Sequence, residues 1–245
     1  MTTKRTLTLL ALFVAVAAVV PAARGFVTRQ VGFIAQVPEN RTAPPRRPSP
    51  PPVAPGTRRI PLVSIEVAQA PTLAALLRPT DQVLEIVYPA GSLTDSPHDT
   101  PEEAVERLTA HTALAIVRLL RKESALTPDG KTIYTTLTVD VVEVLKDATG
   151  RLVAGASAEL QQFGGEVTIG NQRVMVRSLD LRPLEVGRLY LAAIDKSGDR
   201  LLFSSNSAEV DGNTVRALRL DHPSPATTRS ADWIKQEVRR RGGPR

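Results

Sequence analysis

The stretch KTIYTTLTVDVVEVLK, from Lys131 to Lys146, decides the fold. Apolar and β-branched side chains recur in it at every second position, which predicts a long β-strand with one side against a core. The inward set is Ile133, Thr135, Leu137, Val139 and Val141, and the outward set is Tyr134, Thr136, Thr138 and Asp140. At Val141-Val142 the alternation slips by one, so we expect Val142 and Val144 to continue the apolar side. Such a slip is typical of a bulge or of a strongly coiled barrel strand.

Shorter strands are predicted on both sides of this segment from runs of β-branched and apolar residues. They are Leu114–Leu120, Ser157–Phe163, Leu189–Ile194 and Arg200–Phe203. Together the segments predict a mainly β fold, a small closed or partly open barrel of five to six strands with one or two short helices.

A hairpin is predicted where Gly170-Asn171 separates EVTI from QRVMVR, because a two-residue turn with glycine first suits this connection. The register places Val167 opposite Val174, with Ile169 and Val176 on the same face. The other face then carries Glu166, Thr168, Arg173 and Arg177. We expect this hairpin to belong to the barrel.

The helices are predicted from their caps. Thr100-Pro101-Glu102-Glu103 supplies a capping residue, a proline and an acid at the third helical position, so a helix begins there and ends near Ala110. Ser230 begins a second helix, in which Ile234 and Val238 form the apolar side and the arginines at 239–241 suit the C-terminal end.

The first 25 residues have the layout of an export signal. Lys4 and Arg5 precede an apolar run from Leu9 to Ala23, which suits the core of a signal peptide and, if it is not cleaved, a membrane anchor. Residues 26–61 follow as a Pro/Arg-rich linker, with 9 prolines and 5 arginines between Pro38 and Pro61. Such a proline-rich segment cannot bury enough apolar surface to order itself, so we expect a disordered spacer that the domain does not need for folding.

The rest of the chain divides into three further parts. Residues 62–99 carry weak patterns: strands at Val63–Val67 and Gln82–Tyr88, with a helical turn at Thr72–Arg78. The barrel occupies residues 100–222, and a basic C-terminal helix and tail occupy residues 223–245.

Charge is distributed unevenly along these parts. Residues 1–59 hold 9 Lys and Arg and 1 Glu, residues 60–228 hold 16 Lys and Arg and 22 Asp and Glu, and residues 229–245 hold 6 Lys and Arg and 2 Asp and Glu. The net charge of +6 thus combines an acidic body with two basic tails. We expect any binding to polyanions to depend on the tails and to disappear when residues 26–61 and the chain from Arg229 onward are removed.

Chemistry-bearing residues are sparse. The chain has no cysteine, which excludes disulfides and thiolate sites. Asp95, His98 and Asp99 form the best candidate for a metal-binding cluster, but such residues in a loop more often serve turns and caps. His111 and His222 are isolated, and Asp140 and Glu143 suit a solvated strand edge, with Glu143 paired to Lys146, better than acid/base work. We therefore predict no catalytic, metal or cofactor site.

The order of these segments resembles the OB-like barrel domains of uncharacterised exported bacterial proteins. The matching features are Ala115-Ile116-Val117, Tyr134 through Lys146, Gly164-Gly165 and Gly187 through Ile194, over roughly residues 100–210. A looser similarity to the OB-like metalloproteinase-inhibitor fold lacks the N-terminal cysteine pair of those inhibitors. The resemblance implies an OB-like barrel and carries over no site residue.

The sequence leads to one functional expectation and one alternative. We expect an exported binding or interaction module at the cell envelope that uses no cofactor and takes a protein or another envelope component as its partner. Sequence-specific nucleic-acid binding is not expected, because the body is acidic and Tyr134 is the only aromatic residue on the outer side of the long strand. Membrane contact would come only from an uncleaved N-terminal segment. The alternative is an envelope enzyme, such as a hydrolase, whose site has no recognisable motif.

Overall fold

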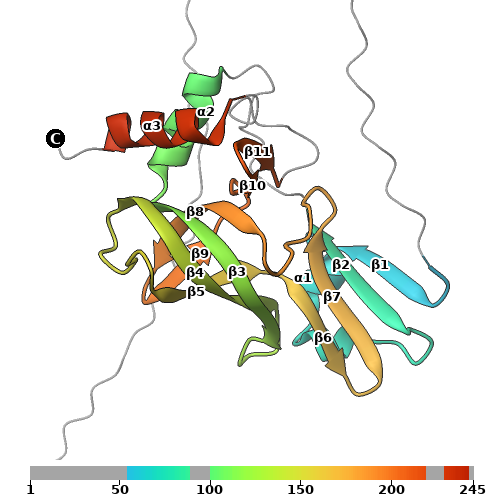
Figure 1. Ribbon diagram of the computed structural model, residues 1–245. Helices are drawn as coiled ribbons and strands as arrows, with labels where there is room; N and C mark the ends of the chain where they lie inside the picture. Colours follow the sequence, from blue (N-terminus) through green and yellow to red (C-terminus); the bar gives the residue numbers. More distant parts are fainter. Residues whose placement is uncertain (1–53, 89–99, 219–228, 243–245) are drawn as a thin grey trace, which may run out of the picture. The chain divides into compact units, whose positions relative to one another are not determined.

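The computed structural model is mainly β over residues 54–88, 100–218 and 229–242, the part of the chain that the structure describes (Figure 1). The strands are β1 Thr57–Pro61, β2 Val83–Tyr88, β3 Ala113–Leu126, β4 Ile133–Asp147, β5 Ser157–Phe163, β6 Gly165–Ile169, β7 Gln172–Ser178, β8 Leu189–Ser197, β9 Arg200–Phe203, β10 Ala208–Asp211 and β11 Thr214–Ala217. The helices are α1 Ile65–Gln69, the 3-10 helix η1 Leu73–Leu76, α2 Pro101–Ala110 and α3 Ala231–Gly242. The predicted fold class is confirmed.

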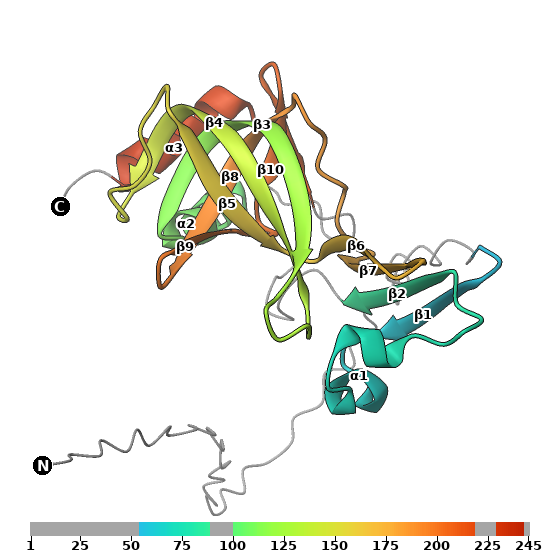
Figure 2. The same ribbon diagram turned by 90° about the horizontal axis from the view of Figure 1, so that it is seen from below.

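Five strands of the larger sheet close into a ring in the order β3-β4-β5-β9-β8, because β8 pairs with both β3 and β9. The pairs are antiparallel except for β5 and β9, which run parallel at Gln161 and Leu202. Figure 2 shows the five strands curving around a shared interior. Buried apolar side chains from all five strands fill it, among them Leu119, Leu137, Leu160, Ile194 and Phe203. The ring thus has an apolar core of its own, and β10 and β11 extend the sheet beyond β8.

The long central strand β4 faces inward as its sequence predicts. Every member of the inward set is buried, and every member of the outward set is half-buried. Val117 pairs with Val141 and Ile116 with Glu143, so Val142 lies in a bulge, as expected. Val142 itself is 46% exposed, and the expectation that it continues the apolar side is wrong because a bulge turns the extra residue outward. Val144 packs against the interior.

Substitutions on the two sides of β4 should therefore differ in cost. Leu137→Ala and Val139→Ala should each lower the free energy of unfolding by about 2–4 kcal/mol, because both side chains are 1% exposed and their removal leaves a cavity. Thr138→Ala, on the outer side between them, should cost less than about 1 kcal/mol. Urea denaturation of the three variants measures the contrast, and equal losses at all three positions would contradict this assignment of inside and outside.

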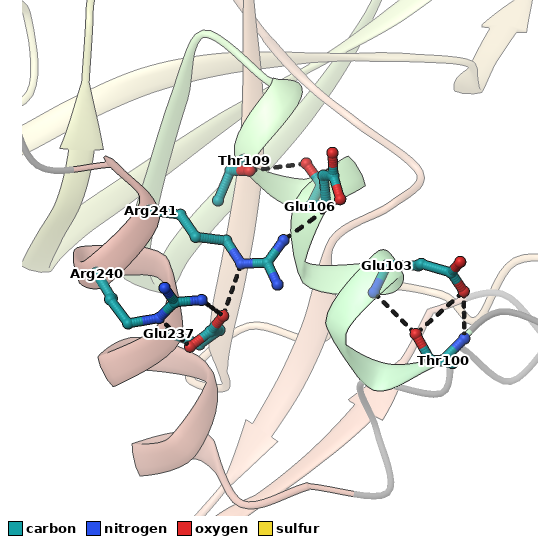
Figure 3. Close-up of polar contacts among 7 residues, drawn as sticks. All are labelled: Thr100, Glu103, Glu106, Thr109, Glu237, Arg240 and Arg241. Carbon is teal, nitrogen blue, oxygen red and sulfur yellow. Dashed lines mark hydrogen bonds and ion pairs between the residues drawn. The ribbon is translucent and has the colours of Figure 1, made fainter. Parts of the chain in front are cut away.

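Helix α2 begins as predicted. The Thr100 hydroxyl accepts from the Glu103 amide at 3.3 Å, and the Glu103 carboxylate accepts from the Thr100 amide at 2.7 Å (Figure 3). This reciprocal capping box satisfies backbone donors that the first turn leaves free. The Ser230 hydroxyl likewise accepts from the Trp233 amide at 3.2 Å, so the predicted cap of α3 is confirmed.

Helix α3 is part of the folded domain and not a separable tail. It lies against α2, and its side chains Ile234 and Val238 are 1% and 0% exposed in a second core cluster with residues of α2, β3, β8, β10 and β11. Helix α3 thus packs with residues that lie before the predicted division at 222/223, and removal of the chain from Arg229 onward would remove buried apolar side chains as well as charge. Arg229 itself lies 5.2 Å from the centre of the Trp233 ring.

The basic residues of α3 are paired with acidic residues. Arg240 and Arg241 both bind Glu237, and Arg241 also reaches Glu106 of α2 at 3.4 Å (Figure 3). Hydrogen bonds from Arg240 and then Arg241 lower the pKa of Glu237 to about 2. Arg239 and Lys235 pair with Glu143 of β4. These ion pairs neutralise much of the positive charge that the sequence analysis assigns to a free tail.

The second sheet has the order β1-β2-β7-β6 and corrects three expectations. The hairpin β6–β7 has the predicted register, Val167 opposite Val174, but it leaves the ring and pairs with β2. The end of the segment assigned to the linker is strand β1, in which Arg58 and Arg59 pair with Asp81 and Glu85 and so need not face solvent. The strand expected at Val63–Val67 is instead the start of α1, whose first turn is capped by Ser64.

Other expectations for residues 62–99 agree with the structure or lie outside it. Strand β2 and the turn η1, which Thr72 caps, lie where the sequence places them. The candidate metal cluster at Asp95, His98 and Asp99, the residue His222 and the proposed export signal lie outside the described residues. Within the described ranges, no helix is both long enough and apolar enough to cross a bilayer.

Candidate functional site

A cleft of about 550 Å³ lies where one end of the ring meets the small sheet. Strands β3, β4 and β5 contribute Lys122, Ser124, Thr135, Gln162 and Phe163 to its lining. Strands β2, β6 and β7 contribute Tyr88, Gly165, Glu166, Met175, Val176, Arg177 and Ser178, and the segment after β7 contributes Leu181, Arg182, Pro183 and Leu184. Its volume falls in the range of small-molecule and peptide sites.

The floor of the cleft is the junction Gly164-Gly165, where the chain passes directly from β5 of the ring into β6 of the small sheet. Both residues have positive φ, +90° and +143°, which glycine adopts without the strain of a side chain. The Thr135 hydroxyl donates to the Gly164 carbonyl at 2.7 Å, and Ser124 and Thr135 lie 2.8 Å apart through their hydroxyls. Since the single proton of Thr135 is used on Gly164, Ser124 is the donor in the second bond.

Three cationic side chains reach the cleft from different elements. The Lys122 ammonium donates to the Leu184 carbonyl at 3.0 Å, which leaves it two further protons to donate. Arg177 extends from β7 and is held by Glu85 of β2 at 2.5 Å. Arg182 is exposed, and within the described ranges its guanidinium makes no hydrogen bond or ion pair. The cleft therefore presents donors to an incoming group.

Glu85 orients Arg177 from inside the sheet. Its carboxylate is 2% exposed and also accepts from Arg59 of β1 at 2.5 Å. Burial acts to raise the pKa of Glu85, but the hydrogen bonds from Arg59 and Arg177 outweigh it, so the pKa lies below the ordinary value of 4.5. Glu85 is thus ionised at neutral pH and fixes the guanidinium of Arg177 at the edge of the cleft.

The stability contributed by Glu85 should depend on pH. Because its pKa is lowered in the folded state, the contribution is fully present above about pH 4.5 and is lost as pH falls through the folded-state value. Glu85→Gln should cost about 2–4 kcal/mol near pH 7, where it removes a buried ion pair, and less near pH 3. Urea denaturation of both proteins at the two pH values tests this. A cost that stays constant with pH would contradict the assigned role of the carboxylate.

The aromatic residues of the cleft are engaged with one another. The rings of Tyr88 and Phe163 meet edge to face at 5.0 Å, and Tyr134 meets Phe163 at 5.7 Å. The Tyr88 hydroxyl donates to the Phe163 carbonyl at 3.1 Å, and burial raises the pKa of Tyr88 to about 12. This tyrosine therefore stays protonated at neutral pH and serves to join β2 to the end of β5.

The histidine that the sequence leaves isolated has partners in the fold. His111 Nδ1 lies 2.9 Å from Asp195 of β8, and its Nε2 lies 3.1 Å from the Asn206 amide nitrogen. Because an amide nitrogen only donates, Nε2 is the acceptor and Nδ1 carries the proton that Asp195 accepts. Both ring nitrogens are therefore occupied, and His111 joins the end of α2 to the ring.

The two strand carboxylates also have structural surroundings. Asp140 lies on the outer side of β4, as expected, whereas the expected pairing of Glu143 with Lys146 is wrong. Glu143 pairs with Lys235 and Arg239 of α3, and Lys146 donates to the carbonyls of Thr109 and His111 at the end of α2. The pairing could not be anticipated because it depends on the docking of both helices on β4.

The cleft itself was missed by sequence reasoning because its residues are spread from Tyr88 to Leu184 and form no motif. The pair Gly164-Gly165 was the one visible signal.

In the part of the chain that the structure describes, no three His, Asp or Glu side chains gather where they could hold a metal ion. Comparison with known proteins adds no assignment: no protein-family model matches the chain, and no curated protein matches it.

Proposed function

We propose that this chain is an exported binding module whose OB-like barrel takes its ligand in the cleft between the ring and the small sheet. Numbered along the chain, the ring strands β3, β4, β5, β8 and β9 follow the neighbour order 1-2-3-5-4, and this closed order supports the OB-like part of the proposal. OB folds bind ligands at their second and third strands. The corresponding strands here, β4 and β5, contribute Thr135, Gln162 and Phe163 to the cleft.

The observation that carries the proposal is the character of the lining. Cationic, hydroxyl and amide groups line the cleft together with apolar side chains, as in sites that fix the orientation of a bound molecule. Among the described residues that line it, Glu166 is the only carboxylate and histidine is absent. The Ser124 hydroxyl is engaged by Thr135, and the Lys122 ammonium is engaged by the Leu184 carbonyl. Binding therefore accounts for the lining better than acyl transfer does.

The surface of the ring supports a ligand other than nucleic acid. The outer side of β4 carries Thr136, Thr138 and Asp140, and the ring of Tyr134 packs against Phe163. Single-stranded nucleic acids are bound on exposed aromatic faces in a basic groove. The export layout of residues 1–25 supports a location at or beyond the cell envelope, where the partner is a protein or another envelope component.

A photo-reactive amino acid at Gln162, inside the cleft, tests the proposal in cells that produce the full chain. We expect irradiation to join the protein to a discrete component of the envelope fraction. The control carries the same group at Val153, which is 63% exposed and lies outside the cleft, and should give no such product. Identical products from both positions, or none from Gln162, would refute the cleft as the binding site.

A further inference from the structure

We infer that the ligand of the cleft is an extended acidic segment of a partner protein. This inference rests on the proposed function and names the chemistry that the cleft would recognise. Three features carry it: an excess of positive charge, an arginine with free donors, and a strand edge that ends in the cleft.

The charge around the cleft is positive although residues 60–228 are acidic overall. Lys122, Arg177 and Arg182 line it against the single carboxylate of Glu166. That carboxylate is already bound by Arg173 of β7 at 2.6 Å. The buried carboxylate of Glu85 is likewise held by two arginines. Among the described residues that line the cleft, cations therefore outnumber carboxylates. A negatively charged ligand would neutralise the excess positive charge of the lining.

The arrangement favours carboxylate as the negative group. The planar guanidinium of Arg182 offers paired donors that match the two oxygens of a carboxylate, and no described residue occupies them. Lys122 adds a point charge that is anchored by only one carbonyl. Arg177 is fixed in direction by Glu85 and is therefore less free to follow a ligand than Arg182.

The edge of β6 favours a peptide over other carriers of carboxylates. Strand β6 is last in the order of the small sheet, so among the described strands it is hydrogen-bonded in a ladder only to β7, while Ser124 of β3 and Thr135 of β4 approach its first residue, Gly165. Its first residues, Gly165 and Glu166, line the cleft. An extended peptide can add to such an edge through its backbone while alternate side chains turn into the cleft. Met175 and Leu181 would contact its apolar side chains, and the cations would bind its acidic ones.

The probe for this inference is a fluorescently labelled peptide of alternating glutamate and valine, titrated with the full chain. We expect it to bind, and we expect Arg182→Gln and Lys122→Gln each to weaken binding about tenfold, the effect of one lost charge-assisted hydrogen bond. Lys196→Gln removes the same charge from an exposed position outside the cleft and should leave the affinity unchanged. Thermal unfolding of the three variants should match that of the unsubstituted chain.

Four further probes distinguish binding of a peptide backbone from binding of negative charge alone. A lysine–valine peptide should not bind, and the glutamate–valine peptide with alternate backbone amides methylated should bind at least about tenfold more weakly. Heparin or free glutarate, added at the same concentration of negative charge as the peptide, should not displace the peptide. If either one displaces it through Arg182 and Lys122, the cleft remains a site for anions but the peptide assignment is wrong. If the variants bind the peptide as well as the unsubstituted chain, the inference fails even where the photo-reactive group at Gln162 gives its product. If the peptide does not bind through Arg182 and Lys122 and the photo-reactive group at Gln162 also gives no product, the proposal of a binding module is refuted.

Discussion

A chain that ends at residue 228, and so lacks α3, should lose cooperative folding. Ala231, Ile234 and Val238 are buried in the second core cluster, and their removal exposes the apolar surface of α2 and β3 beneath them. Burial of an aliphatic side chain contributes about 1.5–3 kcal/mol, so the loss of Ile234 and Val238 alone amounts to about 3–6 kcal/mol, a large share of the net stability of many domains. Glu143 would also lose both of its cationic partners.

Near-ultraviolet circular dichroism and a thermal scan of the shortened chain measure this effect. The matched control ends after Gly242, which keeps all of α3. It should unfold as the full chain does. A shortened chain that still melted cooperatively within a few degrees of the control would show that the ring needs no helix over this face.

Gly165→Ala should be a strongly destabilising substitution at the cleft. Its φ of +143° lies in a region that residues with a side chain rarely adopt, and an added Cβ would collide with the hydroxyl oxygens of Ser124 and Thr135. The strain and the collision together should lower the free energy of unfolding by about 3–5 kcal/mol. Neither hydroxyl can retreat easily, because the two are bonded to each other and Thr135 is bonded to the Gly164 carbonyl.

Gly170→Ala provides the matched control for this prediction. Gly170 also has positive φ, +63°, but an added Cβ there meets nothing within 4 Å. Its cost should be about 1 kcal/mol. Ser124→Ala removes one of the two colliding oxygens and should recover part of the stability of Gly165→Ala. Equal costs for the two glycine substitutions would mean that strain alone, without the close approach, explains the glycine at 165.

Local signals in the sequence predicted local structure well. The alternation of β4, the capping box at Thr100 and the turn at Gly170 each depend on residues that are neighbours along the chain, and the structure confirms all three. The ring of strands was also predictable from the sequence. Long strands with one apolar side can bury that side in only a few arrangements.

The small sheet and the cleft did not follow from the sequence, because they depend on contacts between distant segments. Strand β1 lies in the segment that the sequence assigns to the linker. Its Arg59 pairs with Glu85 of β2, which also pairs with Arg177 of β7, so these contacts join three strands that are far apart in the sequence. The cleft depends on the same long-range contacts. Arg177 and Arg182 line it together with Lys122 because the hairpin β6–β7 belongs to the small sheet and not to the ring. The period-two pattern predicts which side chains of a strand are buried, but it does not predict which other strand pairs with it.

The parallel pairing of β2 with β7 also affects how the domain can be completed during synthesis. Val83 pairs with Arg173, 90 residues later in the chain, and among the described strands β1 pairs only with β2. A chain that emerges with its N-terminus first therefore presents β1 and β2 without β7, the second partner of β2, until the hairpin has been made. Pairings of such wide sequence separation form slowly and leave strand edges open to other chains in the meantime. If this protein crosses a membrane before it folds, those two strands are the segments that a holding chaperone would need to cover.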